Sequence, residues 1–213
     1  MDINSFMESF KENLLRIFGD SLLFLGLQGS YGRGEAKETS DIDPVIILQQ
    51  CGKDEILKYR GYIDTLPEKD ILCGFVSSID ELRAWESADR AQLILDTKPV
   101  YRDLAELCPP ITGDDIRRAV QQGACAIYHA SSHNILHARD WSILPELYKS
   151  ARFTIRMKHY LQTGVYLSAF RELIAVADKE EKTILETQNP NTENDAFMLL
   201  EWASNTIKDI NAD

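Results

Sequence analysis

The sequence predicts an α/β domain over residues 1–107 followed by an all-α domain over residues 112–213. The first part alternates short apolar runs of strand length with segments of helical apolar spacing, which is typical of a sheet covered by helices. Beyond residue 112, almost every segment has helical spacing. Between the two parts, Cys108-Pro109-Pro110-Ile111-Thr112-Gly113 contains two prolines and a glycine, which do not continue a helix. We therefore place the domain boundary there.

The elements of the first part follow from local patterns. A helix is expected over residues 5–18, because four apolar side chains recur there at helical spacing: Phe6, Phe10, Leu14 and Ile17. Strands are expected over residues 22–27, 44–48 and 71–76, each of which is a short apolar run. A further helix is expected from about residue 79.

The second part contains clear helix start and stop signals. Thr112 and Asp114 are suitable caps for a helix that runs to about Arg139. Pro145 fits the first turn of the next helix, and Gly164 fits its C-terminal end. Helices near 166–187 and 195–210 are expected to follow, separated by Asn189-Pro190-Asn191. The second part is therefore predicted to be a helical bundle.

Composition and charge restrict the partners. The chain has 213 residues, 34 acidic against 23 basic side chains, and a net charge of −11. Such a balance argues against a nucleic-acid partner, since no basic tract of phosphate-tracking length is present. No apolar run approaches the roughly 20 residues that cross a bilayer, and the first residues are not cationic. We expect a cytoplasmic protein with no membrane partner, whose four widely spaced cysteines are reduced.

The stretch from residue 29 to residue 43 contains side chains suited to binding phosphate and metal. Gly29-Ser30-Tyr31-Gly32-Arg33 follows a predicted strand, and it offers backbone N–H groups, a hydroxyl and a guanidinium to a phosphate chain. Asp41 and Asp43 follow at the start of the next strand, two residues apart, so both carboxylates project from one face. Two adjacent carboxylates repel each other unless a cation lies between them, and Mg²⁺ prefers such oxygen ligands.

The order of these motifs resembles the signature of the DNA polymerase β-like nucleotidyltransferase superfamily, in particular the small antibiotic-type enzymes with a helical C-terminal domain. The resemblance implies a mixed sheet in the first domain. It implies that Gly29 and Ser30 hold the β- and γ-phosphates of a nucleoside triphosphate and that Arg33 adds charge there. It also implies that Asp41 and Asp43 carry Mg²⁺ and take part in catalysis. A lysine of the helical domain often contacts the triphosphate in such enzymes, and Lys149 is the candidate.

The sequence departs from the family pattern at the third carboxylate. The family has a third carboxylate on a later strand, but the segment over residues 71–77 contains no acid. Aligning this segment by its Phe-Val-Ser end places Leu72 where the acid is expected. Glu68 and Asp70 precede the strand and are alternatives, as are Asp140 and Glu146 in the second part. The sequence leaves the general base unassigned.

Two further sets of residues lie in the helical part. Four side chains fall within an arc of roughly 80° on an ideal helix and form a cationic stripe: Lys149, Arg152, Arg156 and His159. Such a stripe favours a role in binding phosphate over a face that only contacts solvent. Arg152 and His159 also match the loose pattern of HEPN ribonucleases. Histidines at four-residue intervals, His129, His133 and His137, share one side of the preceding helix, and we favour pocket lining or packing over a metal site for them.

The sequence thus predicts a Mg²⁺-dependent nucleotidyltransferase that moves a nucleoside monophosphate, AMP from ATP by preference, onto a hydroxyl of a small-molecule or protein acceptor. One alternative is a nucleotide-binding or interaction module with impaired catalysis. Another is a toxin–antitoxin-like fusion of a nucleotidyltransferase with a HEPN-like half. The acceptor and the oligomeric state are left open, with a homodimer among the options.

Overall fold

The computed structural model describes residues 2–210. The chain divides into two compact units, Met1–Pro110 and Ile111–Asp213. Each unit has its own hydrophobic core.

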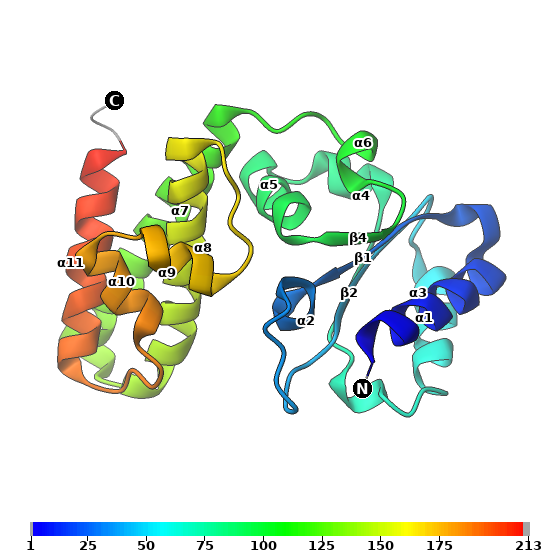
Figure 1. Ribbon diagram of the computed structural model, residues 1–213, viewed down its shortest axis with the longest axis horizontal. Helices are drawn as coiled ribbons and strands as arrows, with labels where there is room; N and C mark the ends of the chain where they lie inside the picture. Colours follow the sequence, from blue (N-terminus) through cyan, green and yellow to red (C-terminus); the bar gives the residue numbers. More distant parts are fainter. Residues whose placement is uncertain (1, 211–213) are drawn as a thin grey trace. The chain divides into compact units, whose positions relative to one another are not determined.

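The first unit alternates helices and strands, as Figure 1 shows in blue to green. Its elements in chain order are α1 (Ile3–Phe18), β1 (Leu22–Gln28), α2 (Gly29–Arg33), β2 (Asp43–Leu48), α3 (Lys53–Ile63), β3 (Phe75–Ser78), α4 (Ile79–Ala84), α5 (Ser87–Asp96), β4 (Lys98–Tyr101) and α6 (Leu104–Leu107). Short 3-10 turns at Gly19–Ser21 and Lys69–Ile71 lead into the first and third strands.

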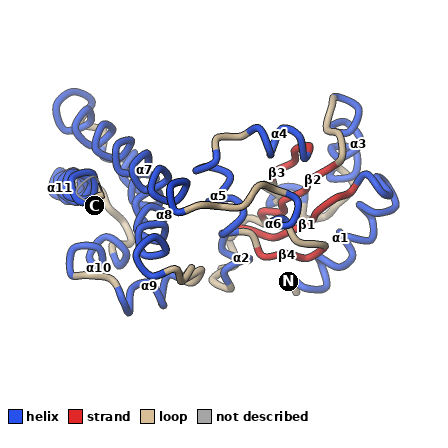
Figure 2. The backbone as a smooth tube through the Cα atoms, turned by 90° about the horizontal axis from the view of Figure 1, so that it is seen from above, coloured by secondary structure: helices blue, strands red, loops and turns tan. Residues whose placement is uncertain are grey.

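The four strands form one mixed sheet in the order β3-β2-β1-β4, drawn in red in Figure 2. β1 pairs antiparallel with both β2 and β4, whereas β2 and β3 are parallel. The mixed sheet expected from the family resemblance is therefore confirmed.

Helices cover both faces of this sheet. On one face, Phe10 and Leu14 of α1 and Tyr59 of α3 pack against a cluster of strand residues that includes Leu25 and Ile46. On the other face, strand residues pack against apolar side chains of α4, α5 and α6: Phe24, Val45 and Ile47 against Ile79, Leu82, Leu93 and Leu104. Figure 1 shows these two helical layers on either side of the strands. Alternation along β2 gives each face its own core, which fixes the direction in which every side chain of the strand points.

The second unit consists of helices only, coloured from green to red in Figure 1. Its α-helices are α7 (Gly113–His133), α8 (Leu144–Thr163), α9 (Phe170–Val176), α10 (Lys179–Glu186) and α11 (Glu193–Asp209). A π-helical turn, Asn134–Ala138, extends α7, and a 3-10 turn at Trp141–Ile143 leads into α8.

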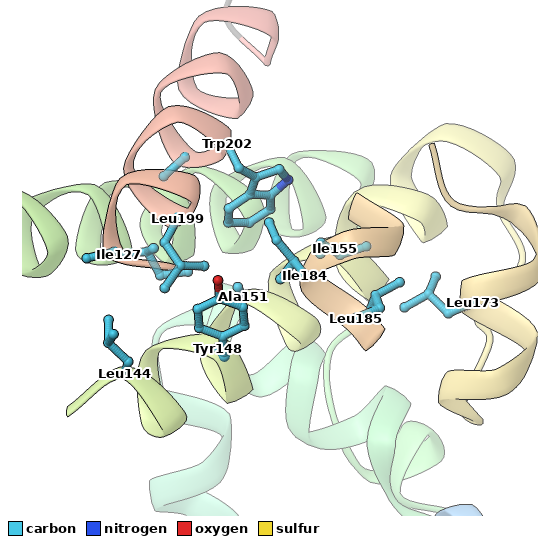
Figure 3. Close-up of a cluster of buried hydrophobic side chains, with 12 residues drawn as sticks. Ile127, Leu144, Tyr148, Ala151, Ile155, Leu173, Ile184, Leu185, Leu199 and Trp202 are labelled. Carbon is cyan, nitrogen blue, oxygen red and sulfur yellow. The ribbon is translucent and has the colours of Figure 1, made fainter. Parts of the chain in front are cut away.

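Large buried side chains hold the second unit together. Trp202 of α11, Tyr148 of α8 and Ile184 of α10 converge in the cluster drawn in Figure 3. Trp202 is 1% exposed and Tyr148 is also 1% exposed, so both rings are removed from water. Burial of aromatic and aliphatic groups on this scale accounts for the stability of a bundle whose individual helices would be marginal alone.

Two predicted elements differ from the structure. The helix expected over residues 166–187 is divided into α9 and α10, because Ala177 is extended and Asp178 begins a new helix by accepting a hydrogen bond from the N–H of Glu181. The strand expected over residues 71–76 begins only at Phe75, since a 3-10 turn occupies Lys69–Ile71. Within residues 2–210, no helix is both long and apolar enough to span a membrane.

Candidate functional site

The turn that carries the glycine-serine pair is a short helix directly after β1. Its first residue, Gly29, has a φ of +66°, a conformation that favours glycine. Gly32 lies against the strand, where an added Cβ atom would approach the carbonyl oxygen of Leu27 to 2.5 Å. α2 can therefore lie close to the end of β1 because neither position carries a side chain.

Asp43 lies beside this turn. It is the first residue of β2 and is paired with Gln28, the last residue of β1. A Cβ atom at Gly29 would overlap with the carboxylate of Asp43. The structure thus brings together Gly29 and Asp43, which the sequence places far apart, and leaves Asp41 exposed in the loop two residues before β2.

Arg33 is held in place by acidic side chains. Its Nε lies 3.3 Å from a carboxylate oxygen of Glu35, and its Nη1 lies 3.4 Å from one of Asp96. The side chains of Arg33 and Asp96 are 11% and 6% exposed, so this pair is largely shielded from water. Asp96 ends α5, and Gln28 donates to the carbonyl of Leu93 on the same helix at 3.2 Å. The end of α5 therefore fixes both the strand end and the turn that follows it.

Sequence reasoning did not identify Asp96 as part of this region. It precedes β4 by two residues and belongs to no recognisable motif. Only the tertiary fold brings it to Arg33.

The position for a third carboxylate lies on the segment that leads into β3. Ile42 is bridged to Leu72, and Val45 is paired with Phe75, both in parallel register. The same register places Cys73 level with Asp43. Side chains that are level in a parallel pair point to the same face of the sheet.

The alignment that placed Leu72 at the acid position is wrong by one residue. Leu72 packs against the core beneath α1 and α3, on the face opposite to Asp43. The residue on the face of Asp43 is Cys73, whose side chain is exposed and whose thiol is free. Asp70 and Glu68 lie in and before the 3-10 turn that precedes this segment.

Lys149 lies on α8 in the second unit. Its ammonium group is 3.9 Å from the carboxylate of Glu146, and the two side chains are 64% and 79% exposed. Its part in binding phosphate stays a prediction.

The cationic stripe of α8 has different environments along its length. Arg152 is half-buried and donates to the carbonyl of Thr187, and burial lowers the pKa of its guanidinium. Arg156 is 0% exposed, and its guanidinium carbon lies 4.5 Å from the ring centre of Phe170 and 5.2 Å from that of Phe153. These two arginines fasten α8 to the segments that follow it. The stripe is therefore not one continuous binding face.

The donor set beside β2 suits a hard divalent ion. Asp41 and Asp43 would supply two carboxylates, and Mg²⁺ in nucleotide enzymes commonly takes one or two carboxylates together with substrate phosphates and water. Within residues 2–210, no group of three or more His, Cys, Asp or Glu side chains is arranged to hold a metal. The residues present therefore fit an ion that takes part of its shell from the nucleotide.

Comparison with known proteins identifies the domain that contains the glycine-serine turn and the two aspartates. Residues 7–107 match the nucleotidyltransferase domain family. The first unit therefore carries a nucleotidyltransferase domain of the kind found in the DNA polymerase β-like superfamily of enzymes. The match covers the sheet, the glycine-serine turn and both aspartates.

One curated protein matches part of this chain in sequence. A putative protein adenylyltransferase of Methanocaldococcus jannaschii is 33% identical over 66 residues, which are 31% of this chain and 45% of the relative. The matched region thus spans less than half the length of that relative.

A solved structure is similar over nearly the whole chain. The spectinomycin adenyltransferase AAD(9) from Enterococcus faecialis, crystallised with ATP and spectinomycin, covers 95% of this chain and 98% of its own, at a TM-score of 0.58 and 17% identity. This likeness confirms the fold class of a nucleotidyltransferase domain with a helical C-terminal part.

Proposed function

We propose that this nucleotidyltransferase transfers AMP from ATP to a hydroxyl group and releases pyrophosphate. The observation that supports this most directly is the position of Gly29 against the carboxylate of Asp43. In this proposal, the turn that binds phosphate lies beside an aspartate that binds metal, as the chemistry requires. The names of both similar proteins refer to adenylyl transfer, which favours ATP as the donor.

In this proposal, the turn at Gly29 and Ser30 binds the β- and γ-phosphates through its backbone N–H groups and the hydroxyl. Asp41 and Asp43 hold Mg²⁺, which neutralises charge on the triphosphate. Arg33, positioned by Asp96, contributes positive charge close to the same turn. Each of these groups orients the α-phosphorus for attack.

The bonds exchanged are those of nucleotidyl transfer. The hydroxyl oxygen of the acceptor forms a bond to the α-phosphorus of ATP, and the bond from that phosphorus to the bridging oxygen of the β-phosphate breaks. Pyrophosphate leaves with the bonding electrons, and the hydroxyl proton passes to a base. In this proposal, Cys73 occupies the position of the expected third carboxylate, so the segment that leads into β3 does not supply an acidic base.

The acceptor is proposed to be a small polar molecule or a protein side chain. One of the two similar proteins is named as a protein adenylyltransferase, and the other is named as an adenyltransferase of the small molecule spectinomycin. A net charge of −11 favours a cationic acceptor over an anionic one.

The presence of Cys73 favours a second candidate, a nucleotide-binding module with little or no turnover. Calorimetric titration with a non-hydrolysable ATP analogue, with and without Mg²⁺, separates binding from chemistry. A parallel assay of Mg²⁺-dependent pyrophosphate release from ATP, with candidate hydroxyl acceptors, measures turnover.

The matched variants are Asp43→Asn and Asp41→Asn, with Asp54→Asn, an exposed acid in the first turn of α3, as the control. We expect Mg²⁺-dependent binding in the wild type and the control and its loss in the two site variants. Binding without pyrophosphate release would select the second candidate. Binding that is unchanged in both site variants would overturn the assignment of the site.

A further inference from the structure

Three of the four histidines of the second unit form an exposed row. His129 and His133 lie on the last turns of α7, and His137 lies in the π-helical turn that follows. All three side chains are exposed. None of them packs into the core of the bundle, so the packing expected as one alternative from the sequence is wrong, whereas the lining of an acceptor pocket stays a prediction.

The π-helical turn has a specific structural cause. The N–H of Arg139 donates to the carbonyl of Asn134 at 2.7 Å, which closes a turn one residue wider than that of an α-helix. The side chain of Asn134 is 1% exposed and binds the backbone of Asp140 twice, at 3.0 Å to its carbonyl and 2.9 Å from its N–H. A buried side chain therefore holds this turn in place.

The wider turn changes the spacing of the imidazole rings. The ring centres of His129 and His133, both on regular α-helix, are 6.5 Å apart. Those of His133 and His137, which the π-turn separates, are 5.2 Å apart and inclined at 57°. Although both pairs are four residues apart in sequence, only the second has close, mutually inclined rings.

This difference favours the second pair as ligands of one ion. With a metal–nitrogen bond of about 2.1 Å, two imidazoles in a tetrahedral shell have ring centres roughly 5 Å apart. Ring centres about 6.5 Å apart correspond to two ligands on opposite sides of the metal. The spacing of His133 and His137 matches the first arrangement.

We propose that His133 and His137 form a surface site for one borderline divalent transition-metal ion, with Zn²⁺, Ni²⁺ and Cu²⁺ as the candidate ions. Imidazole nitrogen is a preferred ligand of these ions and a poor one of Mg²⁺. Since no third protein ligand is arranged around the pair within residues 2–210, water completes the shell. This site is separate from the carboxylates of the first unit in its ligands and in its metal, and it does not depend on the proposed nucleotidyl transfer.

The test is calorimetric titration of Ni²⁺ and of Zn²⁺ into the full chain in excess Mg²⁺, so that the carboxylate site is already occupied. His137→Ala and His129→Ala form a matched pair, because both remove an exposed imidazole that neighbours His133. The same titrations in the Asp43→Asn variant exclude a contribution of that carboxylate. Circular dichroism checks that each variant retains its helical content.

We expect one ion per chain in the wild type, with Ni²⁺ bound at micromolar concentration. We expect His137→Ala and His133→Ala to weaken this affinity at least tenfold, and His129→Ala to change it less than twofold. An equal loss in His129→Ala and His137→Ala would overturn the assignment to the π-turn pair. Absence of binding in the wild type at millimolar metal would overturn the site altogether.

Discussion

Gly29 lies so close to Asp43 that any side chain at Gly29 would overlap with the carboxylate. The two residues belong to a helical turn and to the start of a strand, and the antiparallel pairing of β1 with β2 brings them together. Because Gly29 also has a positive φ, this position requires glycine for two independent reasons.

Substitution of Gly29 should therefore be more damaging than substitution of a glycine with a similar backbone. Gly34 also has a positive φ, of +73°, but an added Cβ atom there meets nothing within 4 Å. We expect Gly34→Ala to cost about 1 kcal/mol through backbone strain alone. Gly29→Ala should cost more and should weaken binding of the ATP analogue at least tenfold. Urea denaturation and calorimetry measure the two effects, and equal losses in both variants would contradict the overlap with Asp43.

Cys73 offers a gain-of-function experiment. Because Cys73 is level with Asp43 and exposed, Cys73→Asp should place a third carboxylate beside the first two. We expect tighter binding of Mg²⁺ in the presence of nucleotide, and faster pyrophosphate release if the base limits turnover. Cys73→Ser serves as the conservative control and should leave metal binding unchanged.

An aspartate at the neighbouring position, Leu72, should destabilise the fold instead of adding a metal ligand. Leu72 is partly buried and packs against the core beneath α1 and α3, so Leu72→Asp would bring a carboxylate against apolar groups. We expect this variant to lose about 1–3 kcal/mol of stability, as urea denaturation followed by circular dichroism would show. A stable Leu72→Asp variant with enhanced metal binding would show that the register is shifted by one residue.

The cations of α8 should differ sharply in their effect on stability. Arg156 is fully buried against aromatic rings, so Arg156→Ala removes both cation–π contacts and packing and should cost about 3 kcal/mol. Lys149 is 64% exposed, and Lys149→Ala should change stability by less than about 0.5 kcal/mol. Thermal and urea denaturation, followed by circular dichroism, measures the stability of both variants. Similar losses would mean that the whole stripe is a surface feature.

The N-terminus of α11 should respond to acid. Burial acts to raise the pKa of Asp195, but hydrogen bonds from the Thr192 hydroxyl and from the N–H groups of Asn191 and Thr192 outweigh it, so the pKa lies below its ordinary value. A depressed pKa in the folded state stabilises the fold above the unfolded value of about 3.9, and this contribution is lost as the pH falls through the folded value. We expect Asp195→Asn to cost about 1 kcal/mol at neutral pH.

This cost should shrink as the pH falls below about 4, because the wild-type carboxyl then becomes protonated as well. Urea denaturation of both proteins across this pH range measures it, with Glu193→Gln, an exposed acid in the same helical turn, as the control. A difference between the wild type and Asp195→Asn that stays constant down to pH 2 would contradict the role of the charge.

The sequence by itself determined the parts of this protein that depend on local patterns. Apolar spacing predicted α1, β1 and β2, and the two prolines before Ile111 predicted where the helical part begins. The Gly29-Ser30 pair, Asp41 and Asp43 led to the nucleotidyltransferase superfamily, because glycine, hydroxyl and carboxylate groups lie within a short stretch of the sequence.

Only the tertiary structure decided which distant residues meet. Cys73 rather than Leu72 is level with Asp43, because the core beneath α1 takes the leucine and strand alternation then turns the cysteine to the other face. Arg33 pairs with Asp96 because α5 returns to the end of β1. Spacing along the chain does not carry this information, since register, burial and long-range ion pairs depend on how the elements pack together.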